Sequence, residues 1–405
     1  MLSAQSPSLL RRVAVRAALL LSLAVLIWQL VLFYPEVQQP VSDFTEYWAA
    51  GRLLLQGENP YDPVQMGAMQ RALGRPNVNP LLMYNPPWTL SVLLPFAVLS
   101  YGLGKLAWIL FQGAALLFSV DRLWQLYGGD PRLRWLAWGL GVSFVPVLFA
   151  LNEGQLMPLV LLGLVAFLEF VDHQHGGWAG AALVVASFKP QLLYLLLLAV
   201  LCWVVSRHQW KVIWGGLGGL AAMLVIPAAL RPQLIPEYLY FVLHEPLSRW
   251  APPTLGTLLR LWWGHEHFWL QFMPVLIGLA WFIWLWSSER QHWDWRKHLP
   301  RLLLASMTLN AYGWVHDQTI LLIAVIAMAV PLIQKAARPW LLGAAGAYFI
   351  LNGVLIALQL ARVGELGYVW LAPVWWGGYT ILQRHLQSLP RFWSENIDEE
   401  ATTLA

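Results

Sequence analysis

The chain is poor in charge and almost free of cysteine. Only 11% of its 405 residues are charged, whereas a soluble domain averages roughly 25%. The single cysteine, Cys202, lies inside an apolar run, which excludes a disulfide framework and a cysteine-based metal site. The sequence also has no P-loop, no Gly-rich dinucleotide motif and no zinc signature. These absences disfavour an enzyme that uses soluble nucleotides, and we expect neither a cofactor nor a metal.

Hydrophobic residues dominate instead, at 59% of the chain with 26 tryptophans. Apolar runs recur from end to end, and about 20 apolar residues span a bilayer. The sequence therefore predicts an all-α polytopic membrane protein, with a single transmembrane domain over residues 1–390 and a cytoplasmic tail at 391–405. The net charge of +4 does not indicate nucleic-acid binding, because the basic residues lie in short loops where they act as topology signals.

If every basic loop is cytoplasmic, both termini are cytoplasmic and the chain crosses the membrane about twelve times. The first helix then enters from the cytoplasm and is not cleaved. Long outer loops are expected at residues 35–103 and 232–269. The predicted spans are 14–34, 104–121, 135–151, 155–170, 178–188, 191–205, 212–231, 270–287, 302–314, 317–333, 339–358 and 367–382.

Two segments fit this scheme poorly. Residues 85–100, "NPPWTLSVLLPFAVLS", are apolar but short, with prolines at 86, 87 and 95. A re-entrant or interfacial segment is favoured there, since a spanning helix would reverse every later span. Residues 178–205 fit either two short spans that meet at Lys189-Pro190 or one kinked helix.

The scheme collects the unusual polar residues on the outer side. Polar and ionisable groups gathered at one membrane face are typical of a site at the membrane–water boundary, although loops are polar in any case. These groups are Asp43 and Glu46, the stretch from Asn152 to Gln155, Lys189, the stretch from His265 to His267, and the pair His316 and Asp317.

Asp43, Glu46 and Tyr47 have i, i+3, i+4 spacing and share one face of a helix. Residues 43–56 are predicted to form a short interfacial amphipathic helix, with Ser42 or Asp43 as N-cap and Gly57 as its stop. Two readings of Asp43 stay open at this point. It caps the helix, or it is a general base whose pKa apolar surroundings raise into a useful range.

The other polar groups also have two readings each. Gln155 caps a helix end or binds sugar hydroxyls. Lys189 is a snorkelling anchor, or it neutralises a phosphate that would offset its cost at membrane depth. His316 and Asp317 begin a helix, where Asp suits the dipole, or His316 donates to a phosphate and positions the acceptor.

The order of these motifs resembles a known family. "DFTEYWAAGRLLLQGENPYDP", "YNPPWTLSVLLPFAVLS", "NEGQLMPLVLLGLVAF", "AGAALVVASFKPQLL" and "HDQTILL" are similar, in that order, to the DUF2029 membrane glycosyltransferases. This is glycosyltransferase family 87, which includes mycobacterial polyprenol-phosphate-mannose-dependent mannosyltransferases. The resemblance implies a GT-C fold whose first outer loop carries a catalytic Asp, and Asp43 matches that position. It also implies a polyprenyl-phosphate sugar as donor and no nucleotide.

The expected protein is therefore an inverting hexosyltransferase of the bacterial inner membrane, with its site on the outer face. It takes a mannose-like sugar from the lipid donor to a lipid or glycan acceptor, and membrane lipids surround it. A flippase for lipid-linked saccharides is one alternative, although it should show internal repeats and none is visible; a non-catalytic scaffold is another. The expected catalytic residues are Asp43, Glu46 and His316, and the expected binding residues are Tyr47, Arg52, Asn152, Gln155, Lys189 and Asp317.

Overall fold

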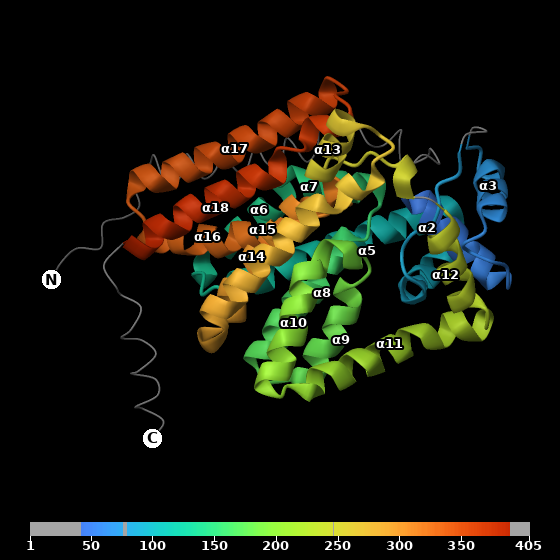
Figure 1. Cartoon of the computed structure of the whole chain (residues 1–405), viewed down its shortest axis with the longest axis horizontal. Helices are drawn as coiled ribbons and strands as arrows, with labels where there is room; N and C mark the ends of the chain where they lie inside the picture. Colours follow the sequence, from blue (N-terminus) through green and yellow to red (C-terminus); the bar gives the residue numbers. More distant parts are fainter. Residues whose placement is uncertain (1–41, 76–78, 246, 389–405) are drawn as a thin grey trace.

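The computed structural model describes residues 42–75, 79–245 and 247–388. This part of the chain consists of helices joined by turns and contains no strand, so the all-α prediction is confirmed for it. The predicted first span at 14–34 and the tail at 391–405 lie outside the described residues. Figure 1 shows α2 (Phe44–Leu55), α3 (Pro63–Ala72) and α12 (Leu234–His244) together at one end of the long axis.

The described helices support a multi-pass membrane protein. Six of them are long and apolar enough to cross a bilayer, and a seventh span results if α6 (Arg134–Ser143) and α7 (Val145–Glu153), which meet at a bend of 59°, are counted together. The predicted number of about twelve is not confirmed, because several helices are too short or too polar for this criterion. Examples are α8 (Met157–Asp172), α15 (Trp295–Leu309) and α18 (Leu371–Ser388).

The basic ends of the helices meet at one end of the bundle. There Arg122 pairs with Glu169, Arg134 with Asp121, and Arg296 with Asp172. These ion pairs join neighbouring helices to one another at this end of the bundle. Helices that begin or end at this face are α5 (Tyr101–Leu126), α9 (Gly176–Ala186), α10 (Tyr194–Arg207), α11 (Trp210–Leu230), α14 (Met273–Glu289), α16 (Leu322–Lys335) and α17 (Arg338–Leu360).

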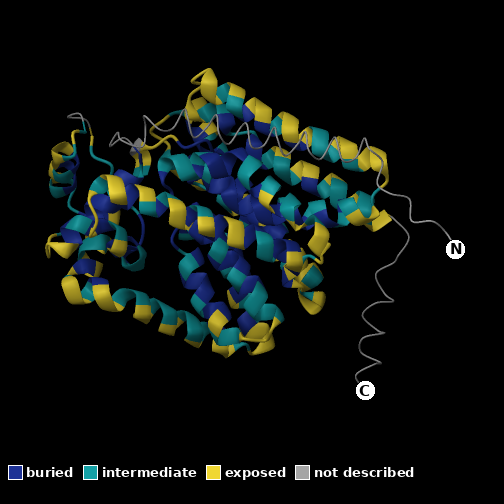
Figure 2. Cartoon of the chain, turned by 180° about the vertical axis from the view of Figure 1, so that it is seen from behind, coloured by how far each residue is buried: buried dark blue, intermediate teal, exposed yellow. Residues whose placement is uncertain are grey.

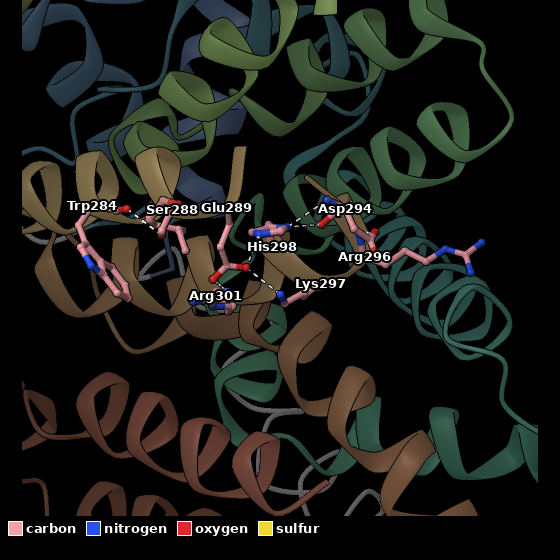
Figure 3. A network of polar contacts seen from close by, with 9 residues as sticks. Trp284, Ser288, Glu289, Asp294, Arg296, Lys297, His298 and Arg301 are labelled. Carbon is pink, nitrogen blue, oxygen red and sulfur yellow. Dashed lines mark hydrogen bonds and ion pairs between the residues drawn. The ribbon is translucent and has the colours of Figure 1, made fainter. Parts of the chain in front are cut away.

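Glu289 is the centre of a network of polar contacts at the same end of the bundle (Figure 3). Its carboxylate accepts hydrogen bonds from Lys297 at 2.7 Å and Arg301 at 2.8 Å, and lies 3.0 Å from Nε2 of His298. The network fastens the end of α14 to the start of α15. The sequence grouped these basic residues on one side of the membrane, and they do lie at one end of the bundle; that this end is cytoplasmic stays a prediction.

Helix α2 agrees with the predicted helix at residues 43–56 in length, but its surroundings differ from those predicted. Gly57 adopts φ +74° directly after α2, and the amide of Glu58 donates to the carbonyl of Leu53 at 2.9 Å, which is a Schellman ending. The prediction of an interfacial amphipathic helix at residues 43–56 was wrong in one respect. Most α2 residues, including every apolar one except Leu55, are buried, because α2 packs between α3, α4 (Leu90–Ala97) and α5 rather than against lipid.

The two ambiguous segments have short, broken helices. Within residues 85–100, one turn of 3₁₀ helix leads into α4, and the apolar helix Pro87–Ala97 covers about 16 Å at 1.5 Å per residue. This is roughly half of the 30 Å hydrocarbon core, which supports the non-spanning interpretation. Residues 178–205 form two helices, α9 and α10, separated at Ser187–Lys189 by a break before Pro190.

Glycines allow α9 and α11 to pack backbone against backbone. A Cβ atom on Gly215 would lie 1.8 Å from the carbonyl oxygen of Gly177, and one on Gly180 would lie 1.9 Å from that of Val212. Small residues at helix contacts are the usual means of close packing in membranes. Figure 2 shows the buried residues gathered in the middle of the molecule, whereas only 11% of the apolar window of α11 is buried.

Candidate functional site

A cavity of about 500 Å³ lies at the end of the bundle opposite Glu289. Seven of the residues singled out from the sequence line it, although they come from distant parts of the chain. The lining residues lie in or beside α2, at the end of α7, at the break between α9 and α10, and in the 3₁₀ turn His316–Leu321 before α16. These residues are Asp43, Glu46, Tyr47, Asn152, Gln155, Lys189 and His316.

Asp43 occupies the N-cap position of α2 but does not cap it with its side chain. Its carboxylate instead accepts a hydrogen bond from the amide nitrogen of Gln155. The amide oxygen of Gln155 in turn accepts a bond from the Tyr47 hydroxyl at 3.0 Å. The reading of Asp43 as a side-chain cap is therefore wrong, and the predicted common face of Asp43, Glu46 and Tyr47 is confirmed by their shared cavity.

Gly154 brings Gln155 into this position. It ends α7 in the left-handed region at φ +71°, and a Cβ atom there would lie 2.7 Å from Cβ of Phe44. Its carbonyl accepts a hydrogen bond from Trp108 at 2.7 Å, and the Gln112 amide donates to the carbonyl of Gln155 at 3.0 Å. A glycine is thus required for the end of α7 to approach the start of α2 so closely.

Lys189 and Asp317 form a buried ion pair. The ammonium donates to the carboxylate at 2.7 Å, and the two side chains are 8% and 0% exposed. The second carboxylate oxygen accepts the backbone N–H of Trp314 at 2.9 Å, and Nε2 of His316 lies 3.5 Å from the first. Asp317 therefore lies behind the cavity wall and holds Lys189 and His316, whereas those two residues face the cavity.

Carboxyl groups outnumber cations on the lining. Asp43, Glu46, Glu153 and Glu365 line the cavity, and Lys189 faces them. Burial raises the pKa of Glu46 well above its ordinary value, and the nearby charge of Asp43 adds to the rise. Glu365 is exposed by its surface area, yet the pKa of its carboxyl is raised because neighbouring groups remove part of its water, with smaller contributions from the charges of Asp43 and Asp317. Both carboxyl groups thus hold a proton to higher pH than usual.

The structure does not bring Arg52 to the cavity. Its guanidinium donates to the carbonyl of Ala97 at 3.1 Å and lies over the Trp48 ring at 5.3 Å. Arg52 therefore caps the end of α4 on the other face of α2. Arg75, which was not singled out from the sequence, does not line the cavity either, but its charge opposes the rise in the pKa of Glu46. Its Nη2 donates to the carbonyl of Asn79 at 3.3 Å, whereas its Nε and Nη1 atoms are buried without a hydrogen-bond partner among the described residues.

Further lining residues were also missed. Asn85 donates to the carbonyl of Phe188 at 3.0 Å and so supports the loop that carries Lys189; its place in "YNPPW" was a usable signal. Gln359, Glu365 and Tyr368 come from the end of α17 and the following 3₁₀ turn (Glu365–Tyr368). No sequence pattern marked these three. Aromatic lining is provided by Tyr84, Phe149, Phe188, Tyr238, Trp250, Tyr312, Trp314 and Tyr368.

Comparison with known proteins agrees with the membrane architecture. The family model for glycosyltransferase family 87 matches residues 83–309, a range that includes Asn152, Gln155 and Lys189 and ends before His316. Protoheme IX farnesyltransferase 2 from Paramagnetospirillum magneticum (strain ATCC 700264 / AMB-1) is 32% identical over 106 residues, which cover 26% of this chain. The match spans 34% of that protein, about a third of its length. No solved structure matches.

Proposed function

We propose, from the premise that the chain belongs to glycosyltransferase family 87, that it transfers a hexose from a polyprenyl-phosphate donor to an acceptor hydroxyl. The chain is a membrane glycosyltransferase by that membership and by its apolar helices. The donor class, a mannose-like sugar, the outer-face location and the residue roles are proposals. The observation that carries them is the convergence of Asp43, Lys189 and His316 on one cavity.

Asp43 is the proposed general base. Its carboxylate takes the proton of the acceptor hydroxyl while the acceptor oxygen forms a bond to the anomeric carbon. The bond between that carbon and the phosphate oxygen breaks, and its electron pair leaves with the polyprenyl phosphate. Attack from the face opposite the leaving phosphate inverts the configuration. The Gln155 amide, which donates to Asp43, fixes the carboxylate for this transfer.

Lys189 is the proposed partner of the leaving phosphate, whose negative charge grows as the bond breaks. Asp317 takes one of its donors and holds the ammonium at the cavity wall, which leaves two N–H groups for phosphate oxygens. His316 lies beside it and supplies a further donor. Arg75 does not line the cavity, but its charge interacts with Asp43 and Glu46, and it is proposed to attract the donor phosphate from outside the lining, the role expected for Arg52.

Glu46 is proposed as a neighbour that tunes Asp43 rather than as a second base. Its raised pKa favours the protonated form, and a neutral Glu46 avoids like-charge repulsion beside the base. The protein needs no metal or cofactor in this proposal. The acceptor presents a hydroxyl group.

The test is a transfer assay with purified protein in nanodiscs and a panel of polyprenyl-phosphate hexoses. We expect transfer from at least one lipid donor without nucleotide, and none from nucleotide sugars. Arg75→Gln should raise the KM for the donor several-fold, whereas Arg52→Gln, on the other face of α2, should leave it unchanged. Transfer from a nucleotide sugar alone would contradict the proposed donor.

A further inference from the structure

Helix α13 (Leu255–Trp263) has its polar residues turned toward the protein and its apolar residues turned outward. Thr257 and Arg260 are buried, at 2% and 5% exposure. A surface helix of a soluble protein has the opposite arrangement, with its apolar stripe against the core. Four exposed residues at helical spacing form what we call the apolar face of α13: Leu258, Leu261, Trp262 and Trp263.

The polar side of α13 is fixed to the protein by hydrogen bonds. The amide nitrogen of Gln271, a fully buried residue, donates to the hydroxyls of Thr254 at 3.0 Å and Thr257 at 3.2 Å. Its amide oxygen accepts a bond from Arg260 at 3.1 Å. A Cβ atom on Gly256 would lie 2.3 Å from the carbonyl oxygen of Gln271, so the two backbones are in close contact. These contacts fix the outward direction of the apolar face.

The apolar face lies beside the start of a membrane span. Helix α13 packs on the 3₁₀ turn Phe268–Phe272, which leads into α14 (Figure 1), and the segment Phe268–His292 is long and apolar enough to cross a bilayer. The exposed surface continues onto this segment through Trp269, Phe272 and Leu276. Helix α13 itself has 9 residues and is about 14 Å long at 1.5 Å per residue, so it is too short to cross.

We infer that α13 is an interfacial helix, whose apolar face lies in the headgroup region of the lipid bilayer. Trp262 and Trp263 are 84% and 64% exposed, and tryptophan is enriched at the membrane–water interface. Helices that lie in this plane bury one apolar face at the boundary between headgroups and acyl chains. Continuity with the exposed side of α14 favours lipid over a second copy of the chain, because the same surface extends onto a helix that crosses the bilayer.

Arg260 connects this helix to the cavity. Its Nη2 donates to the carbonyl of Ser248 at 2.9 Å, and its Nη1 donates to the carbonyl of Trp250 at 3.4 Å. Leu247 and Trp250 of the same loop line the cavity. The depth of α13 in the interface therefore sets the depth of this part of the cavity lining.

The test is the depth of spin labels on single cysteines, measured by EPR power saturation on the protein in phosphatidylcholine–phosphatidylglycerol nanodiscs. Cys202→Ala, which replaces the single cysteine of the chain, is the background. Trp262→Cys and Leu258→Cys place labels one turn apart on the apolar face, so each checks the other if one variant folds poorly. Ile283→Cys, exposed on α14, is the hydrocarbon reference, and Glu266→Cys, exposed after α13, is the aqueous reference.

Labels at residues 258 and 262 should collide with oxygen in preference to a water-soluble nickel chelate. This preference should be several-fold stronger than at residue 266 and weaker than at residue 283. Accessibility equal to that at residue 266 would place the face in water. Protection from both reagents would place it against a second copy of the chain. Either of these two results would overturn the inference.

The connection to the cavity is tested by the mobility of a label on Trp250→Cys, read from the EPR line shape. Arg260→Met should increase that mobility, because the loop carbonyls lose their donors. Arg207→Met also removes donors to loop carbonyls, those of Arg290 and Gln291, and is the control that should leave the line shape unchanged. Unchanged mobility in Arg260→Met would contradict the link between α13 and the cavity.

Discussion

The side-chain amide of Gln155 joins Asp43 to Tyr47: its nitrogen donates to the Asp43 carboxylate, and its oxygen accepts the Tyr47 hydroxyl at 3.0 Å. The three residues come from two helix ends that are far apart in the sequence. The Tyr47 bond leaves the amide only one orientation, with its nitrogen toward Asp43. Gln155 is thus a positioning residue for the proposed base.

This relationship predicts a graded loss of activity. Gln155→Leu frees the Asp43 carboxylate and should lower kcat by about 10- to 100-fold, a part of the 10²–10⁴-fold range that general base catalysis supplies. Tyr47→Phe removes only the bond that orients the amide, and its loss should be smaller. Steady-state rates at saturating donor and acceptor measure both. Equal, full activity in both variants would contradict the positioning role.

The Lys189–Asp317 pair predicts a separation of stability from activity. Lys189→Met or Asp317→Leu alone leaves an unpaired buried charge and should destabilise the fold by about 3–5 kcal/mol. The double variant removes both charges and should recover most of that stability, because a buried ion pair is often matched by apolar residues. Its transfer activity should stay low, since the phosphate partner is gone. Thermal unfolding and transfer rates, measured on all three variants, check this.

Glu46 predicts a pH dependence of stability. Its pKa is raised in the folded protein by burial and by Asp43, whereas the unfolded value is about 4.3. The folded state therefore binds the proton more tightly, and stability falls as the pH rises from the unfolded pKa through the folded one. Glu46→Gln mimics the protonated form and should remove this loss.

The measurement for Glu46 is the difference in Tm between Glu46→Gln and the wild type across pH. The difference should be small near pH 4 and should favour the variant increasingly toward alkaline pH. Glu58→Gln, which changes an exposed carboxyl in the turn after α2, is the control and should show no such trend. A pH-independent difference for Glu46→Gln would contradict the shift.

The glycines of α11 predict opposite effects of one substitution at neighbouring sites. Gly215→Ala forces a Cβ atom against the carbonyl of Gly177 and should destabilise the protein by about 1–3 kcal/mol, as overpacking does. Gly218→Ala meets nothing within 4 Å and should be neutral or stabilising by up to about 1 kcal/mol, since Ala favours helix. Thermal unfolding in one detergent compares the two directly.

The sequence predicted the composition of the site better than its contacts. Helical spacing put Asp43, Glu46 and Tyr47 on one face, and the cavity confirms it. Arg52 sits on the opposite face of the same helix, where it caps α4, and spacing alone gave no position for α4. Distances between helices depend on tertiary packing, which a local pattern does not encode.

The contribution of Gln359 and Glu365 to the cavity could not be predicted for the same reason. Gln359 lies in the last turn of a long apolar helix and Glu365 begins the 3₁₀ turn that follows it, and only the return of α17 to the α7 end makes them part of the cavity. The burial of α2 was also not predicted, since its amphipathic pattern fits a lipid interface and a protein interior equally well. The number of spans was not confirmed, because several described helices are short or broken where uniform ones were expected.

The most direct test of the account is the rate of sugar transfer by Asp43→Asn at saturating donor and acceptor. The amide keeps the shape of the carboxylate but cannot take a proton, so the rate should fall by about 10²–10⁴-fold with donor binding unchanged. Asp62→Asn is the matched control, because Asp62 caps α3, the helix that follows α2, and Asn caps equally well; it should retain full activity. Wild-type transfer by Asp43→Asn would contradict the account.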